Sequence, residues 1–285
     1  MPLSTLKNTR ILLVLVSVLS NLCVADTFEI AAFEYPPYFD QNGHGMISDL
    51  YDEIFAHTDH EYAIKVYPIN RGLKYFVDQT LDAHATGHVV YHENHHLDLD
   101  WTFSVTSGQF YYKPTRDLSN FSELSELSGL TSVDIRKGDT ISRYERLGIN
   151  VITVERADQQ IRMVEAGRAD MFRSTLLSGL LLIKKHFPLE SGDFGFIPDG
   201  VISISLSTFK GHPKNKVMRG AYNVGLRKLI KNGRYYQVMT RYWGKDNVPK
   251  SILPPTLKSK GINEVDFNKF VEYPRDANLR ILPVP

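Results

Sequence analysis

Two arginines follow segments whose residue pattern predicts strands, and both are candidates for binding a negatively charged ligand. Arg71 lies just beyond the alternating segment 62–68, and Arg173 ends the short apolar segment 169–173. Ligands of open α/β sheets bind beyond the carboxyl ends of the strands, and a planar guanidinium matches a carboxylate or phosphate. For Arg71 the plainer alternative is a solvated residue in the first turn of a helix, although the helix dipole disfavours a cation there. We predict that one of the two supplies the positive charge of a ligand site.

Two further segments carry groups suited to ligand contact. Tyr35 lies in the loop 34–38, where its ring could stack on an apolar or cationic ligand face. The alternative is that Tyr35 only packs the loop beside its prolines. Gly138, Asp139 and Thr140 open a predicted helix after a strand, so their backbone N–H groups can donate to an anionic oxygen. Ordinary capping by Asp139 or Thr140 is compatible with that role.

A histidine-rich segment offers a different chemistry. Five histidines fall within thirteen residues: His84, His88, His92, His95 and His96. Imidazole suits zinc and copper, so together with Glu93 they could form a metal site. No pair has the spacing of a clean metal motif, which favours a polar loop rich in imidazoles. We predict neither a metal nor a cofactor.

The first 25 residues have the pattern of a cleaved export signal. It consists of two basic residues, an apolar run and two small residues before Asp26: Lys7 and Arg10, Ile11–Leu19, and Cys23 and Ala25. The run is too short for a membrane-spanning helix of ~20 residues. We predict cleavage after Ala25 and a periplasmic protein. Cleavage removes Cys23, the single cysteine, and with it disulfide or thiol chemistry.

Composition narrows the class of protein. The 285 residues include 33 Lys and Arg against 32 Asp and Glu, a net charge of +1. A nucleic-acid-binding protein usually has a basic surplus, so we expect no such partner. Hydrophobic content of 42% with 23% charged residues is typical of a globular chain. We expect a soluble monomer after the signal is removed.

The residue pattern predicts two similar α/β units. The first has strands at 27–33, 62–68 and 82–90, helices at 46–57 and 72–79, and a polar loop at 91–100. The second has strands at 130–136, 150–155 and 169–173, with helices at 139–147, 157–167 and 176–187. Strand 107–114 leaves the first unit and strand 201–209 returns to it. Residues 213–243 are predicted as one or two helices interrupted near Asn232-Gly233, followed by an irregular tail rich in proline.

These units predict a two-lobed α/β fold. The exit and return strands would form a two-strand hinge, and the facing strand ends would form a ligand cleft between the lobes. We expect lobe 1 to comprise residues 26–110 plus 201–285, and lobe 2 to comprise residues 111–200.

The chain resembles the periplasmic solute-binding proteins of family 3 over residues 27–245. The matching segments, in chain order, are Glu34-Tyr35-Pro36-Pro37-Tyr38, Gly43 and Gly45 with Asp49-Leu50, Leu81-Asp82-Ala83, Leu127-Ser128-Gly129, Gly138-Asp139-Thr140, and Glu165-Ala166-Gly167-Arg168-Ala169-Asp170. The resemblance implies this two-lobed periplasmic-binding-protein fold, a small-molecule ligand, and a membrane permease of an ABC importer as a further partner. It also places Tyr35 as an aromatic platform at the cleft.

Two positions depart from the amino-acid binders of that family. Those proteins hold the ligand α-carboxylate with an arginine a few residues past the third strand, and the α-ammonium with an aspartate five residues after the position of Asp170. Here the two positions fall near Asn94 and at Thr175. Neither side chain neutralises a desolvated charge, so we expect standard α-amino acids to bind weakly. The predicted ligand contacts are Tyr35, Arg71, Gly87, His88, Asn94, Asp139, Thr140, Arg173 and Thr175.

Three functions compete at this stage. The resemblance favours a non-catalytic binding protein for a small polar or anionic metabolite, feeding an ABC importer. A dehydratase-like enzyme on the same fold, similar to cyclohexadienyl dehydratases, would need an acid or base such as Glu34 or His88. A sensor read by a membrane receptor is the third. The sequence contains no Gly-x-Ser-x-Gly elbow for nucleophilic catalysis.

Overall fold

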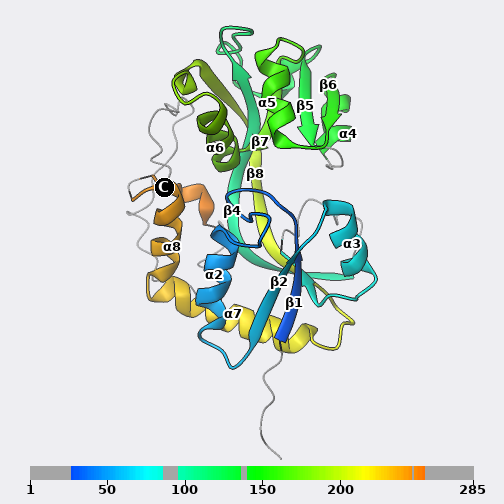
Figure 1. The fold of residues 1–285 in the computed structure, drawn as a ribbon, viewed down its shortest axis with the longest axis vertical. Helices are drawn as coiled ribbons and strands as arrows, with labels where there is room; N and C mark the ends of the chain where they lie inside the picture. Colours follow the sequence, from blue (N-terminus) through cyan, green and yellow to red (C-terminus); the bar gives the residue numbers. More distant parts are fainter. Residues whose placement is uncertain (1–26, 86–95, 136–139, 246, 254–285) are drawn as a thin grey trace, which may run out of the picture.

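The computed structural model describes residues 27–85, 96–135, 140–245 and 247–253. The strands are β1 (Thr27–Ala32), β2 (Glu61–Val66), β3 (Ala83–His84), β4 (Leu97–Tyr112), β5 (Thr131–Ile135), β6 (Asn150–Val154), β7 (Met171–Thr175) and β8 (Phe194–Phe209). They form one sheet in the order β2-β1-β3-β8-β4-β7-β5-β6. Figure 1 shows the helices gathered at the two ends of this sheet, with β4 and β8 running between them. This is the two-lobed α/β fold that the sequence predicts.

Lobe 1 is built around β1, which pairs in parallel with β2 and β3. Its helices are α2 (Met46–Phe55), α3 (Ile69–Val77), α7 (Asn215–Lys231) and α8 (Arg234–Trp243). Helix α2 forms because Met46, Leu50 and Ile54 recur at helical spacing and bury one face, which packs against α7 and α8. The predicted break between the last two helices falls at Gly233, whose φ of 79° favours glycine.

Lobe 2 repeats this plan around β5, which pairs in parallel with β6 and β7. Its helices are α4 (Thr140–Arg146), α5 (Ala157–Glu165) and α6 (Leu176–His186), with short 3-10 turns η1 (Leu124–Leu127) and η2 (Ser191–Asp193). A third such turn, η3 (Lys250–Ile252), follows α8. The third strand of this lobe lies two residues later than predicted. Arg173 therefore lies within β7, and Thr175 ends it immediately before α6.

The two lobes are joined by a two-stranded segment. Strands β4 and β8 have 16 residues each and pair antiparallel along their length. Strand β8 meets β3 at Ser207, and β4 meets β7 from Ser107 onward. Between these points, residues 101–106 pair with β8 and with no other strand of the described chain. This segment is the predicted hinge, although both strands are longer than predicted.

The polar loop predicted over 91–100 is wrong for its last four residues, because 97–100 belong to β4. The acids that suggested a loop are paired with a cation from α7. Arg219 Nη1 lies 2.9 Å from Asp98 Oδ2, and its Nε lies 2.7 Å from Asp100 Oδ2. The predicted strand over 82–90 is described only to residue 85. The export signal and the tail from residue 254 lie outside the described residues.

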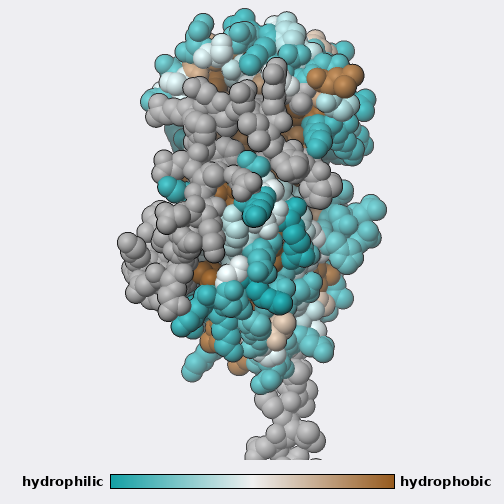
Figure 2. Space-filling model, turned by 90° about the vertical axis from the view of Figure 1, so that its left-hand side faces the viewer, coloured by the Kyte–Doolittle hydropathy of each residue, from teal (hydrophilic) through white to brown (hydrophobic). Residues whose placement is uncertain are grey.

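Large apolar side chains are concentrated inside the lobes rather than on the outer surface. The coloured part of the face in Figure 2 is mostly hydrophilic, with scattered hydrophobic residues. In the described chain, no helix combines the length and apolar character needed to cross a membrane.

Candidate ligand-binding site

The loop after β1 brings two tyrosines to the junction between the lobes. Tyr35 is half-buried, and its ring lies 5.9 Å from that of Phe33 and 5.3 Å from that of Tyr38. The loop is fixed against the start of α2, where Met46 N–H donates to the carbonyl of Pro37. Gly45 is required there, because a Cβ would lie 2.4 Å from the carbonyl oxygen of Tyr38 and the φ is 151°.

Hydrogen bonds from this loop reach across to lobe 2. The hydroxyl oxygens of Tyr38 and Thr175 lie 2.9 Å apart, and the Tyr35 hydroxyl donates to the same Thr175 oxygen over 3.4 Å. Ser178 Oγ donates to the carbonyl of Pro36 over 2.7 Å. Thr175 is buried and is the N-cap residue of α6, but its side chain makes no capping hydrogen bond. Its hydroxyl is therefore engaged by lobe 1 in this conformation.

Burial has a clear effect on the deeper of the two tyrosines. Tyr38 is 1% exposed, and this desolvation raises the pKa of its hydroxyl well above the usual value. The group is neutral at any physiological pH. The Tyr38 hydroxyl can therefore form a hydrogen bond with Thr175, but it carries no negative charge that could neutralise a ligand cation.

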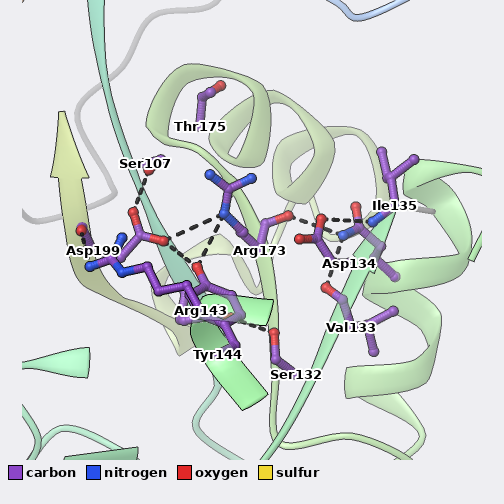
Figure 3. Close-up of polar contacts among 12 residues, drawn as sticks. Ser107, Ser132, Val133, Asp134, Ile135, Arg143, Tyr144, Arg173, Thr175 and Asp199 are labelled. Carbon is purple, nitrogen blue, oxygen red and sulfur yellow. Dashed lines mark hydrogen bonds and ion pairs between the residues drawn. The ribbon is translucent and has the colours of Figure 1, made fainter. Parts of the chain in front are cut away.

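Arg173 anchors a polar cluster on lobe 2 (Figure 3). Its Nε donates to the Tyr144 hydroxyl over 3.1 Å and lies 3.5 Å from Asp199 Oδ2. Asp199 also accepts hydrogen bonds from the hydroxyls of Tyr144 and Ser107. The side chains of Arg173 and Asp199 are 14% and 2% exposed. The arginine is thus held by neighbours in its own lobe, which the sequence did not predict.

The charges around Arg173 are predominantly negative. Burial opposes its positive charge, but Asp134, then Tyr144 and Asp199, outweigh this and raise the pKa of the guanidinium further. Asp134 is the penultimate residue of β5, which pairs with β7, and it is itself buried, with Oδ1 accepting from the Ile135 N–H over 2.7 Å. Burial, then Asp199, raises the pKa of Tyr144, so that hydroxyl stays protonated. The Arg173 guanidinium therefore keeps its positive charge, and the negative charges of Asp134 and Asp199 partly balance it.

The two terminal nitrogens of Arg173 remain available among the described residues. All of its side-chain hydrogen bonds there use Nε. Figure 3 shows the terminal nitrogens pointing toward the side where Thr175 lies, away from Asp199. Since Thr175 contacts Tyr35, this is the side that faces the lobe 1 loop. A planar pair of donors there can take a carboxylate, a phosphate or another polar acceptor.

Arg71 has a different environment. It lies in the first turn of α3, whose N-cap is Pro68, and its side chain is exposed. No ion pair or hydrogen bond joins its guanidinium to another described residue. The structure therefore leaves it as the solvated first-turn arginine considered above, at the edge of lobe 1.

Most of the other predicted contacts lie outside the described residues: Gly87, His88, Asn94 and Asp139. Thr140 is described and is the first residue of α4.

The histidine-rich segment is described only in part, because His88, His92 and His95 lie outside the described residues. His84 is buried between Phe33 and Phe76, and desolvation lowers its pKa to about 4. In the described chain, no three His, Cys, Asp or Glu side chains are close enough to hold a metal.

A separate hollow of about 480 Å³ opens on lobe 2 between α4, η1 and β8. Arg143 and Arg146 line it, and Arg143 Nη2 donates to the carbonyl of Asp199 over 3.2 Å. Asp199 also lines it, but Tyr35, Arg173 and Thr175 do not. The hollow therefore adjoins the Arg173 cluster at Asp199 and does not include the other predicted contacts.

No family model matches the chain, and no curated protein matches it. Several solved structures match the chain in their fold. The glutamate-bound ligand-binding core of GluR0 from Nostoc punctiforme superposes with a TM-score of 0.62 at 15% identity, over 76% of this chain and 99% of that one. A substrate-binding protein of an amino-acid ABC transporter gives 0.60 at 13% identity, over 76% and 99%. A histidine kinase sensor domain similar to periplasmic binding proteins gives 0.63 at 16% identity, over 76% and 96%.

These similarities establish the class of fold. The chain has the two-lobed fold of these periplasmic-binding-protein-like structures, with β4 and β8 as the two strands that join the lobes.

Proposed function

We propose that the chain is a non-catalytic solute-binding protein that closes its lobes around a small polar or anionic metabolite. The observation that carries the proposal is the orientation of Arg173, whose terminal nitrogens face the lobe 1 loop while Nε is held within lobe 2. A ligand acceptor would bind to these nitrogens. Its apolar part would lie against the Tyr35 ring, which contacts the rings of Phe33 and Tyr38.

The ligand is not expected to be a standard α-amino acid in the pose of the family's amino-acid binders. The position of their ammonium-binding aspartate is Thr175, whose hydroxyl is engaged by Tyr38 and Tyr35. The neighbours crystallised with glutamate or arginine share the fold at 18% identity or less. Their ligands therefore define the class of solute only loosely for this chain.

We further propose export to the periplasm through cleavage after Ala25. Lobe 1 would then comprise residues 26–110 plus 201–285, and lobe 2 residues 111–200. The partner is a permease of an ABC importer. A membrane receptor is the second candidate, because the similar structures include a receptor core and a kinase sensor domain. Glu34, one of the two groups available for an enzyme, is exposed.

A thermal-shift screen tests this function. The protein beginning at Asp26 would be heated with carboxylates, phosphate esters, neutral polar metabolites and the standard amino acids. A ligand at ~100 times its dissociation constant should add ~2.7 kcal/mol of stability. We expect a hit among the non-amino-acid compounds that Arg173→Ala abolishes and Arg71→Ala preserves. Micromolar binding of L-glutamate or L-arginine, or chemical turnover of the hit, would count against the proposal.

A further inference from the structure

Asp199 occupies an irregular position in the hinge strands. Ser107 of β4 faces Gly200 of β8, but the next residue, Gly108, faces Pro198. Asp199 is thus the extra residue of a β-bulge, a feature that often re-aims a side chain. The strands are tightly packed here, since a Cβ on Gly108 would lie 2.3 Å from the carbonyl oxygen of Ile197. The bulge lies where the two-stranded hinge joins the sheet of lobe 2.

The bulge turns the Asp199 carboxylate inward, onto three donors. One oxygen accepts from the Ser107 hydroxyl on β4, and the other accepts from the Tyr144 hydroxyl on α4 and faces Arg173 Nε on β7. Its main-chain carbonyl accepts from Arg143. Three elements therefore meet on one carboxylate that is almost completely buried. A fixed carboxylate on one edge of a guanidinium fixes the direction of its other edge.

We propose that Asp199 is the positioning residue for Arg173: the bulge holds its carboxylate against Nε, so that the two terminal nitrogens face the ligand region. The ligand role of Arg173 rests on the function proposed above, but the positioning does not. It is a property of the ligand-free protein and can be measured there.

The test is the side-chain Nε–H signal of Arg173 in ¹⁵N NMR spectra of the ligand-free protein, assigned by its loss in Arg173→Lys. In the wild type this proton should exchange slowly with solvent because it is buried and hydrogen-bonded. In Asp199→Asn, which keeps the size and removes the charge, its exchange should accelerate about 10- to 100-fold. The backbone amide of Phe172 on the same strand reports whether β7 itself has loosened, and its exchange should change little.

Two further variants keep the proposal open to refutation. Ser107→Ala leaves the Asp199 carboxylate charged but removes the donor to one of its oxygens. The exchange of the Arg173 Nε–H proton should therefore accelerate less than in Asp199→Asn. Tyr144→Phe removes the nearer acceptor of Nε while Asp199 remains. If exchange of the Nε–H proton accelerates in Tyr144→Phe and not in Asp199→Asn, Tyr144 positions the arginine and the proposal is wrong.

A second outcome would also overturn the proposal. If exchange in Asp199→Asn accelerates equally at the Phe172 amide and at Arg173 Nε–H, Asp199 stabilises the strand as a whole. A screen that finds no ligand would refute the proposed function and leave this result standing.

Discussion

Arg71 and Arg173 occupy similar places in the two lobes, each near the carboxyl end of a strand, and they differ in what surrounds them. Arg71 follows β2 on an exposed first turn of helix, with no described partner. Arg173 lies within β7, mostly buried, with Tyr144 and Asp199 on its Nε. A strand-end position alone therefore does not fix the direction of a guanidinium. Arg173 has neighbours that hold its Nε, and Arg71 has none among the described residues.

A similar contrast applies to the polar groups around the predicted ligand region. Here lobe 1 supplies neutral tyrosine hydroxyls from the loop after β1, whereas lobe 2 supplies buried charges from strands. Charged groups buried in a lobe depend on one another, because removing one leaves its partner uncompensated. Substitutions should accordingly have larger effects in lobe 2 than at the loop.

The largest effect is expected from Asp199→Ala. It removes a buried carboxylate from Arg173 and should lower the free energy of unfolding by about 3–5 kcal/mol. The control is Asp193, an exposed aspartate in η2 just before β8, and Asp193→Ala should change the free energy of unfolding by less than about 0.5 kcal/mol. Urea denaturation of both variants measures the difference. Similar values for the two would mean that the Arg173 cluster is not held by this pair.

A pH-dependent effect is expected in lobe 1. The pKa of His84 is lowered to about 4 by burial, whereas an unfolded histidine titrates near 6.5. Between these values the unfolded state binds a proton that the folded state does not, so stability falls as pH drops from about 6.5 to about 4. The loss attributable to His84 should reach about 3 kcal/mol at the lower limit and be absent above pH 7.

Unfolding titrations of His84→Gln and of the exposed control His96→Gln isolate this contribution. The first variant should lose part of the wild-type slope between pH 6.5 and 4, and the second should keep it. An unchanged slope in His84→Gln would show that His84 is not buried as the structure has it.

A smaller effect is expected at the junction of the lobes. Tyr38→Phe removes the 2.9 Å contact with Thr175 and should weaken lobe closure by about 1 kcal/mol, a roughly fivefold change in the closed-to-open ratio. Tyr242→Phe is the control, because its hydroxyl donates to Asp49 within lobe 1. Small-angle scattering of the ligand-free protein should show a larger radius of gyration for Tyr38→Phe alone. No difference between the two variants would contradict a role of Tyr38 in closure.

The sequence predicted the order of elements well, because periodicity and glycine breaks are local signals. The parallel units, the paired hinge strands and the break at Gly233 are examples. It also indicated Arg173 and Tyr35 as ligand contacts, and both stay predictions. It missed Tyr38, Tyr144 and Asp199, whose roles come from contacts between residues 26 to 137 positions apart. Asp199-Gly200 has the pattern of a turn, and only the register of β4 against β8 reveals a bulge.

The central claim is that Arg173, and not Arg71, binds the ligand. Titration calorimetry with the strongest hit of the thermal-shift screen tests it on the wild type, Arg173→Ala, Arg173→Lys and Arg71→Ala. We predict a loss of about 2–5 kcal/mol of binding free energy for Arg173→Ala, because the Arg173 side chain is only 14% exposed and a ligand contact there would be buried. Arg173→Lys should recover only part of it, since a lysine lacks the two-pronged geometry. Arg71→Ala should cost under about 1 kcal/mol. A ligand whose affinity falls with Arg71→Ala and is unchanged by both Arg173 variants would contradict the account.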